Sequence, residues 1–232
     1  MHKIMLLNMF KKIILFNIRS VYITNFIDQL FTTKFQLNFL AHIYLSGDID
    51  DIMIGNFIGD YVKGIKYLGY PERISKGIIL HRKIDFFTDK HPITKSCKTF
   101  INPKYGKYSG IVVDIFYDHF LATNWKHYSS VPLKDFVVQK YTILSAYDYF
   151  FPQEVKNFFP HFLETNWLYA YSTFDGLGAV LQNMSAMTTL PDFSSYAIKI
   201  LKENYDDLGK YFFSFFKDII CFVESEYSIK LS

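Results

Sequence analysis

The sequence predicts an all-α fold, a single-domain helical bundle of about seven helices. Long stretches place apolar residues at three- and four-residue spacing, which is the period of a helix packed on one face. Glycine and proline are few, 11 and 7 residues, and the sequence has no alternating strand pattern with hairpin turns. Half of the 232 residues are hydrophobic and 19% are aromatic, so the chain can bury a sizeable core and is not of the disordered class.

The clearest helix in the sequence covers residues 72–89. Pro71 and Glu72 mark its start, because proline suits the first helical position and an acid suits the first turn. Ile74 and Ile78 begin a series of apolar residues at helical spacing. This series predicts that one face of the helix packs against the core.

Five more helices are predicted in the remainder of the chain, with boundaries good to about 2–4 residues. They cover residues 109–128, 132–152, 154–171, 173–187 and 192–226. Asn102, Pro103 and Gly106 predict a loop before the first of these helices. Pro160 predicts a kink or an interruption in the third.

Residues 1–37 differ from the rest of the chain, because they are both basic and apolar. Their uninterrupted apolar runs are far shorter than the ~20 residues that cross a bilayer, and Lys11 and Lys12 would split the hydrophobic region of a signal peptide. The alternation of basic and apolar residues also allows an interfacial amphipathic helix. We expect an N-terminal extension over residues 1–37, a helical domain over residues 38–228 and no transmembrane segment.

Cysteine usage and charge limit the compartment and the partners. The two cysteines, Cys97 and Cys221, cannot build a disulfide framework or a cysteine-based zinc site, so a cytoplasmic location is expected. The net charge is only +3, but residues 63–107 hold eleven Lys or Arg against three acids, a balance of +8. This basic block is either a solvated helix face or a surface that attracts an anionic partner.

The most informative residues are polar side chains embedded in apolar helices. Asp114 and Asp118 are four residues apart, so they share a helical face, and the stretch 110–125 contains no Lys or Arg. His81 and Asp85 share a helical face in the same way. A buried carboxylate needs a positive partner, which is a metal ion or an arginine from another helix.

Seven polar groups of this kind are available for a shared site. They are His42, Asp60, His81, Asp85, Asp114, Asp118 and His119. Taken singly, each is more often a hydrogen-bonded core residue or a member of an ordinary helix pair. Taken together, on four helical segments that would converge in a bundle core, they predict a site for a divalent ion such as Mn²⁺, Mg²⁺, Fe²⁺ or Zn²⁺.

Four polar motifs carry a resemblance to a known family. They are Asn38-Phe39-Leu40-Ala41-His42, Gly55-Asn56-Phe57-Ile58-Gly59-Asp60, Leu80-His81-Arg82-Lys83-Ile84-Asp85 and Asp114-Ile115-Phe116-Tyr117-Asp118-His119. With these motifs the chain resembles the acyl carrier protein phosphodiesterases over residues 38–215 and, more distantly, the HD-type metal phosphohydrolases. The resemblance implies an HD-domain-like fold and a manganese-dependent hydrolase. Such an enzyme releases 4′-phosphopantetheine from holo-acyl carrier protein and leaves the apo-protein.

The resemblance also implies roles for individual residues. The predicted metal ligands are His42, Asp60, His81, Asp114 and Asp118. The predicted general acid and base are Asp85 and His119, and the predicted phosphate clamps are Lys63 and Arg82. Mn²⁺ is the first choice of ion, ahead of Mg²⁺, Fe²⁺ and Zn²⁺. The expected partner is the acidic acyl carrier protein, bound through the basic block 63–107, and no nucleic acid partner is expected.

The chain departs from the family pattern at two places. The family usually carries an arginine after the position of Ser185, where this chain has Ala186-Met187-Thr188, so a contact to phosphate or carrier protein is expected to be lost. Leu37 stands where the family begins with methionine. Since a TTG start codon inside a longer reading frame is translated as leucine, we expect residues 1–37 to be upstream sequence.

Two other functions fit the same residues. An HD-like phosphohydrolase acting on a nucleotide or another small phosphoester would use the same metal chemistry without needing a basic surface. A non-enzymatic helical binding domain would use the His and Asp side chains as buried ion pairs and would bind no divalent ion.

Overall fold

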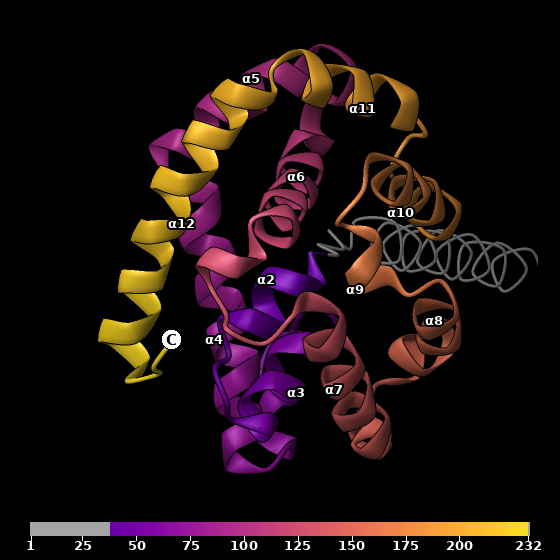
Figure 1. The fold of residues 1–232 in the computed structure, drawn as a ribbon. Coiled ribbons are helices and arrows are strands. Elements are labelled where there is room, and N and C mark those ends of the chain that lie inside the picture. The colour runs from indigo at the N-terminus through magenta and orange to yellow at the C-terminus, as the bar shows by residue number, and fades with distance from the viewer. Residues whose placement is uncertain (1–37, 232) are drawn as a thin grey trace, which may run out of the picture. The chain divides into compact units, whose positions relative to one another are not determined.

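The computed structural model describes residues 38–231, which fold into helices joined by short loops and 3₁₀ turns (Figure 1). The helices are α2 (Phe39–Tyr44), α3 (Asp50–Ile58), α4 (Glu72–Lys90), α5 (Pro92–Tyr105), α6 (Ser109–Thr123), α7 (Leu133–Ala146), α8 (Gln153–Glu164), α9 (Trp167–Ala170), α10 (Phe174–Met187), α11 (Ser194–Glu203) and α12 (Tyr205–Tyr227). The described residues contain no strand, which confirms the all-α class, and more helices than predicted. The predicted extension over residues 1–37 lies outside the described residues.

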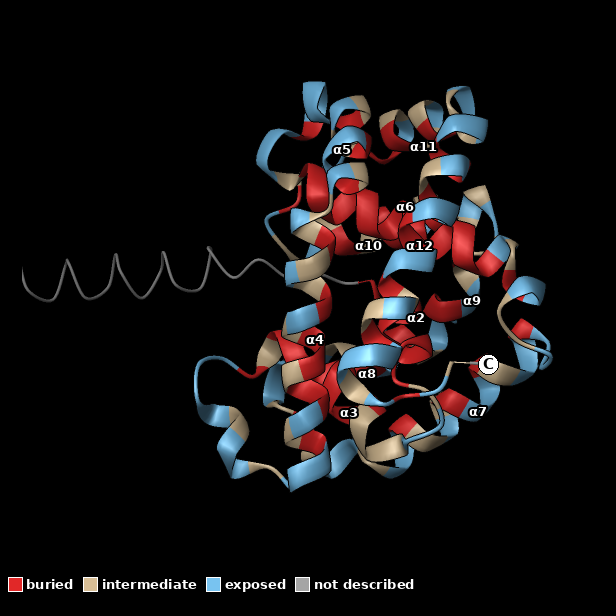
Figure 2. Ribbon diagram, turned by 90° about the vertical axis from the view of Figure 1, so that its left-hand side faces the viewer, coloured by how far each residue is buried: buried red, intermediate tan, exposed pale blue. Residues whose placement is uncertain are grey.

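Helix α6 is the centre of the packing. Each of its residues except Thr123 is buried, as expected for a largely apolar helix that other helices surround. Helices α2, α5, α10 and α12 contact it. Figure 2 shows the buried residues of α6, with exposed residues on the helices around it. Although α6 is apolar, it has only 15 residues, and none of the helices in the described part of the chain is long and apolar enough to cross a membrane.

Helices α3 and α4 cross with their backbones in direct contact. A Cβ atom on Gly55 of α3 would overlap the carbonyl oxygen of Ile74, and one on Gly77 of α4 would overlap the carbonyl oxygen of Ile52. Only glycine fits at both positions, because it has no side chain. The contact brings Asn56, which follows Gly55, against α4.

Helix α2 is short and is held in place by its neighbours. It has six residues, too few for a helix that is stable by itself, and it lies between α3 and α6 (Figure 1). Phe39 at its first position packs against Phe57 of α3 and Phe162 of α8, with ring centroids 5.0 and 4.9 Å apart. The position of α2 is therefore set by tertiary contacts.

The prediction of a loop around Asn102 and Pro103 is wrong. Both residues lie inside α5, which continues to Tyr105, and the chain turns only at Gly106, where φ is +50°. Pro103 has no N–H, so the carbonyl oxygen one turn earlier lacks its helical hydrogen bond. The helix tolerates this loss because Pro103 is exposed in the last turn, where that oxygen can face water.

Two of the predicted long helices are each two helices. Residues 154–171 break at Asn166, which adopts a left-handed conformation with φ +47°, and not at Pro160, which lies within α8. Asparagine enters this conformation more easily than most residues. Residues 192–226 break at Asn204, whose side chain donates a hydrogen bond at 2.9 Å to a backbone carbonyl one turn earlier and so competes with helical bonding.

We predict that Gly55→Ala or Gly77→Ala lowers the free energy of unfolding by about 2–3 kcal/mol, because the added methyl group forces the α3 and α4 backbones apart. Urea unfolding followed by circular dichroism measures this loss. Gly69→Ala is the control, because a Cβ at Gly69 meets no atom within 4 Å, and it should change the free energy of unfolding by less than about 0.5 kcal/mol. Wild-type stability of both helix variants would contradict the backbone contact.

Candidate metal centre

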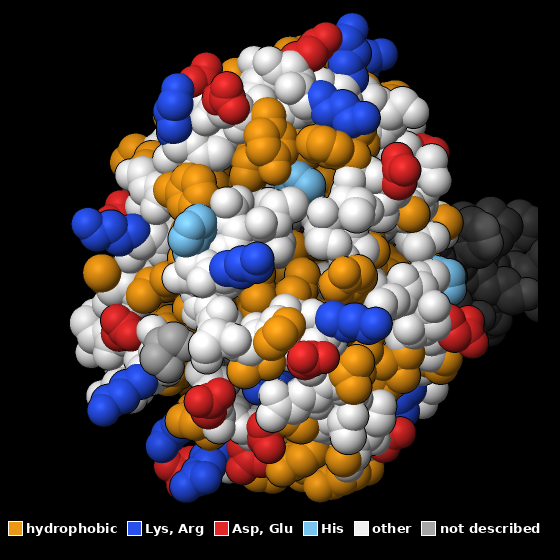
Figure 3. Space-filling view, viewed as in Figure 1, with side chains coloured by type: hydrophobic (Ala, Val, Ile, Leu, Met, Phe, Trp, Pro, Cys, Tyr) orange, Lys and Arg blue, Asp and Glu red, His pale blue; other side chains and the backbone are white. Residues whose placement is uncertain are grey.

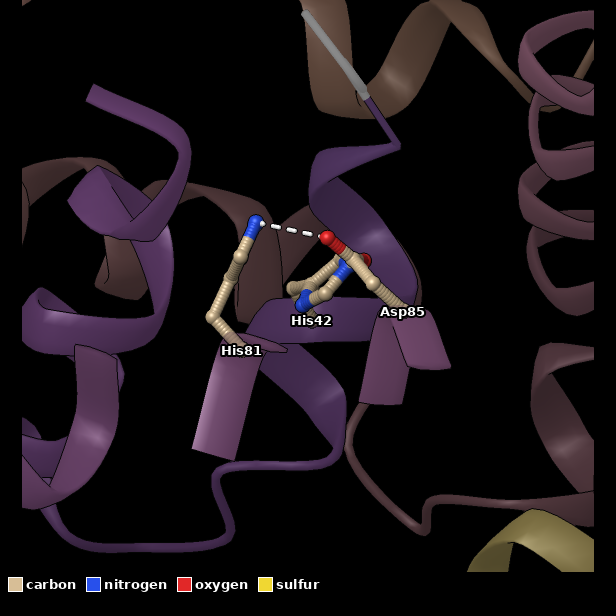
Figure 4. A group of neighbouring side chains, drawn as sticks. All are labelled: His42, His81 and Asp85. Atoms are coloured by element: carbon tan, nitrogen blue, oxygen red, sulfur yellow. Dashed lines mark ion pairs between the residues drawn. The ribbon is translucent and has the colours of Figure 1, made fainter. Parts of the chain in front are cut away.

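Two histidines and one aspartate meet between α2 and α4. The rings of His42 on α2 and His81 on α4 stack with centroids 4.2 Å apart. The Nε2 atom of each histidine lies 3.3 Å from a carboxylate oxygen of Asp85, which is one turn after His81 on α4. One donor atom from each of the three residues lies within 4.8 Å of the others, and Figure 4 shows the three side chains turned toward one another. These three residues are called the His/Asp group below.

Asn56 of α3 orients both imidazole rings. Its side-chain oxygen lies 2.6 Å from Nδ1 of His42, and its backbone oxygen lies 2.8 Å from Nδ1 of His81. The amide nitrogen of Asn56 donates to the backbone oxygen of His42 and to the hydroxyl of Ser46, which identifies the other end of the amide as the acceptor. Each Nδ1 therefore carries a hydrogen, and Nε2 is the nitrogen of each ring that faces Asp85.

The atoms that face the centre of the His/Asp group fit a divalent metal ion. Nε2 of His42, Nε2 of His81 and Oδ1 of Asp85 are buried, and none of them makes a directed hydrogen bond with the described residues. Buried lone pairs that face one another are costly, and one cation would satisfy all three. Two imidazoles combined with carboxylates are a donor set for Mn²⁺, Fe²⁺ or Zn²⁺, and an outer hydrogen bond on Nδ1 is the usual support of a metal-binding histidine.

Asp60 adds a second carboxylate beside the His/Asp group. It lies in the 3₁₀ turn directly after α3, and its Oδ1 is 3.4 Å from Nε2 of His81. Gly59 permits this approach, because a Cβ at that position would overlap the His81 ring. Four of the seven polar residues singled out in the sequence, namely His42, Asp60, His81 and Asp85, thus come together.

Neighbouring charges shift the pKa values of His81 and Asp85, the two members of the group on α4. Burial lowers the pKa of His81, but Asp85 and Asp60 outweigh burial and raise that pKa to about 10. Burial likewise raises the pKa of Asp85, but His81 and His42 outweigh it and hold the pKa of this carboxyl well below its usual range. The site therefore favours a positive charge among its donors, supplied by a proton on His81 or by a metal ion in its place.

Asp118 contacts the backbone of α2. Its two carboxylate oxygens accept hydrogen bonds from the N–H groups of Leu40 at 3.1 Å and Ala41 at 2.8 Å. Helix α2 has no side-chain cap of its own, so Asp118 supplies the missing acceptors from α6. Burial raises the pKa of Asp118 to about 8, although these two N–H groups lower it. Asp118 thereby positions His42, which follows Ala41.

The structure does not bring Asp114 or His119 into the His/Asp group. Nδ1 of His119 lies 2.8 Å from the backbone oxygen of Tyr171, and its Nε2 lies 3.2 Å from the hydroxyl of Tyr205. Burial lowers the pKa of His119, so the ring is neutral and both nitrogens take part in packing contacts. Asp114 is buried near Asp118, whose pKa its charge helps to raise.

Arg82 holds the loop that carries Lys63. Its Nη2 donates to the backbone oxygens of Val62 at 2.6 Å and Gly64 at 2.9 Å. Its guanidinium lies 5.3 Å from the ring centroid of Tyr67, a cation–π contact. Arg82 therefore anchors this loop, and the Lys63 side chain is exposed at the start of it.

The basic block 63–107 is partly neutralised in the folded chain. Lys76 pairs with Glu72 at 2.8 Å, and Lys98 pairs with Asp89 at 2.7 Å. The face drawn in Figure 3 shows acidic and basic side chains interspersed, with hydrophobic side chains between them. Two of the eleven basic residues of the block are therefore paired with acids of the same block.

Asn56 is a site residue that the sequence did not predict. It is fully buried within an apolar stretch, residues 52–58, and a buried amide in such a stretch needs hydrogen-bond partners. That polarity is a detectable signal, but a neutral side chain is less conspicuous in a sequence than the His and Asp residues around it.

The fold and the His/Asp group define a class: an all-helical protein with a candidate site for a divalent ion between its helices. The sequence model of the family described as acyl carrier protein phosphodiesterase matches residues 37–219. The chain belongs to this family, whose members are named as phosphodiester hydrolases.

Curated relatives with this name are similar over most of the chain. The acyl carrier protein phosphodiesterase of Enterobacter sp. (strain 638) is 30% identical over 181 residues, which are 78% of this chain and 94% of the relative. That of Yersinia pestis is 28% identical over 78% of this chain and 94% of its own length. That of Klebsiella pneumoniae (strain 342) is 28% identical over 82% of this chain and 99% of its own length. No solved structure matches the chain.

We predict that Asn56→Leu weakens Mn²⁺ binding by about 10–100-fold, because Nδ1 of His42 loses the acceptor that orients the ring. Isothermal titration with Mn²⁺ measures the affinity. Asn56→Asp keeps the acceptor and should lose less, and Asn157→Leu, on the exposed face of α8, is the control that should bind as wild type. A folded Asn56→Leu protein with wild-type affinity would show that Asn56 has no orienting role.

We predict that Asp118→Ala destabilises the protein by about 2–4 kcal/mol, because two buried N–H groups of α2 lose their acceptors. Asp118→Asn retains one acceptor oxygen and should be intermediate in both urea unfolding and Mn²⁺ affinity. If Asp118 is instead a direct metal ligand, Asp118→Asn will unfold as wild type but fail to bind Mn²⁺, and the capping role assigned here will be wrong.

Proposed function

We propose that this chain is a metal-dependent phosphodiesterase that cleaves the bond between 4′-phosphopantetheine and holo-acyl carrier protein, leaving apo-protein and free 4′-phosphopantetheine. The observation that carries the proposal is the buried His/Asp group, in which Nε2 of both histidines faces Asp85, in a chain of this family. Three further predictions accompany this proposal: an HD-like ancestry, a role in lipid metabolism and a location in the cytoplasm.

We assign the ion-binding role to His42, His81 and Asp85, with Asp60 as the fourth donor, and propose Mn²⁺ as the ion. A divalent ion in such a site supplies positive charge to a phosphoryl group and increases the acidity of water. The donor set is built on α2, α4 and the turn after α3, so its geometry depends on how three elements pack.

The accessible side of the site is at Asp85. Its side chain is 19% exposed, whereas the side chains of His42 and His81 are 2% and 5% exposed. A phosphodiester therefore approaches over Asp85, and the buried imidazoles remain shielded from water.

Lys63 is the proposed phosphate contact. It is exposed in the loop that begins three residues after Asp60, and Arg82 ties this loop down through two backbone oxygens. A cation on a fixed loop can stabilise the charge that develops on phosphoryl oxygens. Arg82 acts through the loop as a positioning residue, because its Nη2 is already used in those two bonds.

We predict that the protein with Mn²⁺ removes 4′-phosphopantetheine from holo-acyl carrier protein, read as a loss of mass from the carrier protein. His81→Ala and Asp60→Ala should each lower the rate by more than about a thousandfold, because the donor set is broken. Chelation of the ion should abolish turnover, and Mn²⁺ should restore it. His161→Ala, on the exposed face of α8, is the control and should keep wild-type turnover.

Two outcomes would contradict the proposal. Turnover of nucleotides or another small phosphoester, with holo-carrier protein left intact, would assign the site to a different phosphohydrolase. Failure to bind Mn²⁺, Mg²⁺, Fe²⁺ or Zn²⁺ by a folded protein would leave the His/Asp group as buried ion pairs.

A further inference from the structure

Three large apolar side chains that are close in sequence to members of the His/Asp group are exposed to solvent. Ile65, Leu68 and Phe86 are 76%, 69% and 64% exposed. Of the other large hydrophobic residues in the described chain, only Tyr149, at 65%, is as exposed. Apolar side chains exposed to this degree in one region are typical of a surface that binds a partner.

Exposed cations surround these apolar side chains. Lys63 and Lys66 alternate with Ile65 and Leu68 in the loop, and residues 61–71 contain no acid. On α4, Lys90 lies over the ring of Phe86, with its Nζ 5.9 Å from the centroid. The six residues Lys63, Ile65, Lys66, Leu68, Phe86 and Lys90 are called the docking surface.

The two halves of the docking surface are connected through Arg82. This arginine holds the loop by hydrogen bonds to the backbone oxygens of Val62 and Gly64. Phe86 is four residues after Arg82 and Lys90 is four residues after Phe86, so all three share one face of α4. The loop therefore continues directly into the stripe of α4 that carries Phe86 and Lys90.

The docking surface borders the His/Asp group at its open side. Asp85, the most exposed member of the group, immediately precedes Phe86. Asp60 lies three residues before Lys63, at the other half of the surface. A partner seated on both halves would place a group attached to it over Asp85.

A recess in the surface can receive an apolar side chain of the partner. It has a volume of about 410 Å³ and is lined by residues of α4, α5 and α12, among them Lys83, Phe86, Lys90, Phe222 and Glu226. Its largely apolar lining and its two lysines match an apolar residue flanked by acids.

We infer that the docking surface binds the acidic protein substrate itself, through acidic side chains that alternate with apolar ones, and so delivers the phosphodiester to the His/Asp group. This inference rests on the proposed function. A small phosphoester would not need exposed isoleucine, leucine and phenylalanine, and a second copy of this chain would meet the same lysines with repulsion.

The experiment compares a protein substrate, which would contact the docking surface, with a small diester, which needs only the His/Asp group. The full chain with Mn²⁺ is assayed on holo-acyl carrier protein and on bis-p-nitrophenyl phosphate, and binding of labelled apo-carrier protein is titrated directly. Lys66→Glu with Lys90→Glu, and Ile65→Ser with Leu68→Ser, should each raise KM for holo-carrier protein and Kd for apo-carrier protein about tenfold or more. Cleavage of the small diester should stay at its wild-type rate.

Matched controls change the same residue types elsewhere. Lys134→Glu with Lys156→Glu reverses two exposed lysines on α7 and α8, and Val138→Ser with Tyr149→Ser removes two exposed apolar side chains. Both controls should keep the wild-type KM and Kd. Raising the salt concentration should weaken carrier-protein binding by wild type but weaken it less in the lysine variant.

The outcomes separate this inference from the proposed function. If wild type cleaves holo-carrier protein and the docking variants keep its KM and Kd, the surface is wrong and the function stands. If the docking variants lose only binding to vesicles of anionic lipid, the surface faces a membrane and the inference is overturned. If wild type neither cleaves nor binds carrier protein, the proposed function fails first.

Discussion

Both imidazoles of the His/Asp group are held by the ring nitrogen that faces away from Asp85, and one residue, Asn56, holds both. The side-chain oxygen of Asn56 takes the Nδ1 hydrogen of His42, and its backbone oxygen takes that of His81. Because one residue supplies both acceptors, the two rings are fixed relative to each other and to α3. The direction in which both Nε2 atoms face, and with it the fit to a divalent ion, follows from these two bonds.

The helices around Asn56 are held by contacts of different kinds. The α3–α4 crossing depends on Gly55 and Gly77, where the two backbones touch. The short helix α2 depends on Asp118, which caps it from α6. Each contact lies outside the donor set but determines where one of its members stands, so a substitution at any of them can change the site without touching a donor.

The site and the proposed docking surface share α4. His81 and Asp85 point from one side of this helix toward α2, while Phe86 and Lys90 occupy the adjoining exposed side. A protein that carries its reactive group on a long arm needs a contact for its body and a site for the bond to be cut. With the candidate site on one face of α4 and the proposed docking surface on the adjoining face, a single helix would supply both at a fixed separation.

The sequence by itself determined the all-α class and the His81–Asp85 pair, because helical periodicity and four-residue spacing are local properties of the chain. It could not determine which distant polar residues meet. Asp60 and Asp118 are both aspartates next to apolar residues, yet tertiary packing puts one beside His81 and the other on the backbone of α2. Buried polar groups take whichever partner the packed helices bring within reach, so only the tertiary structure separated donors from caps.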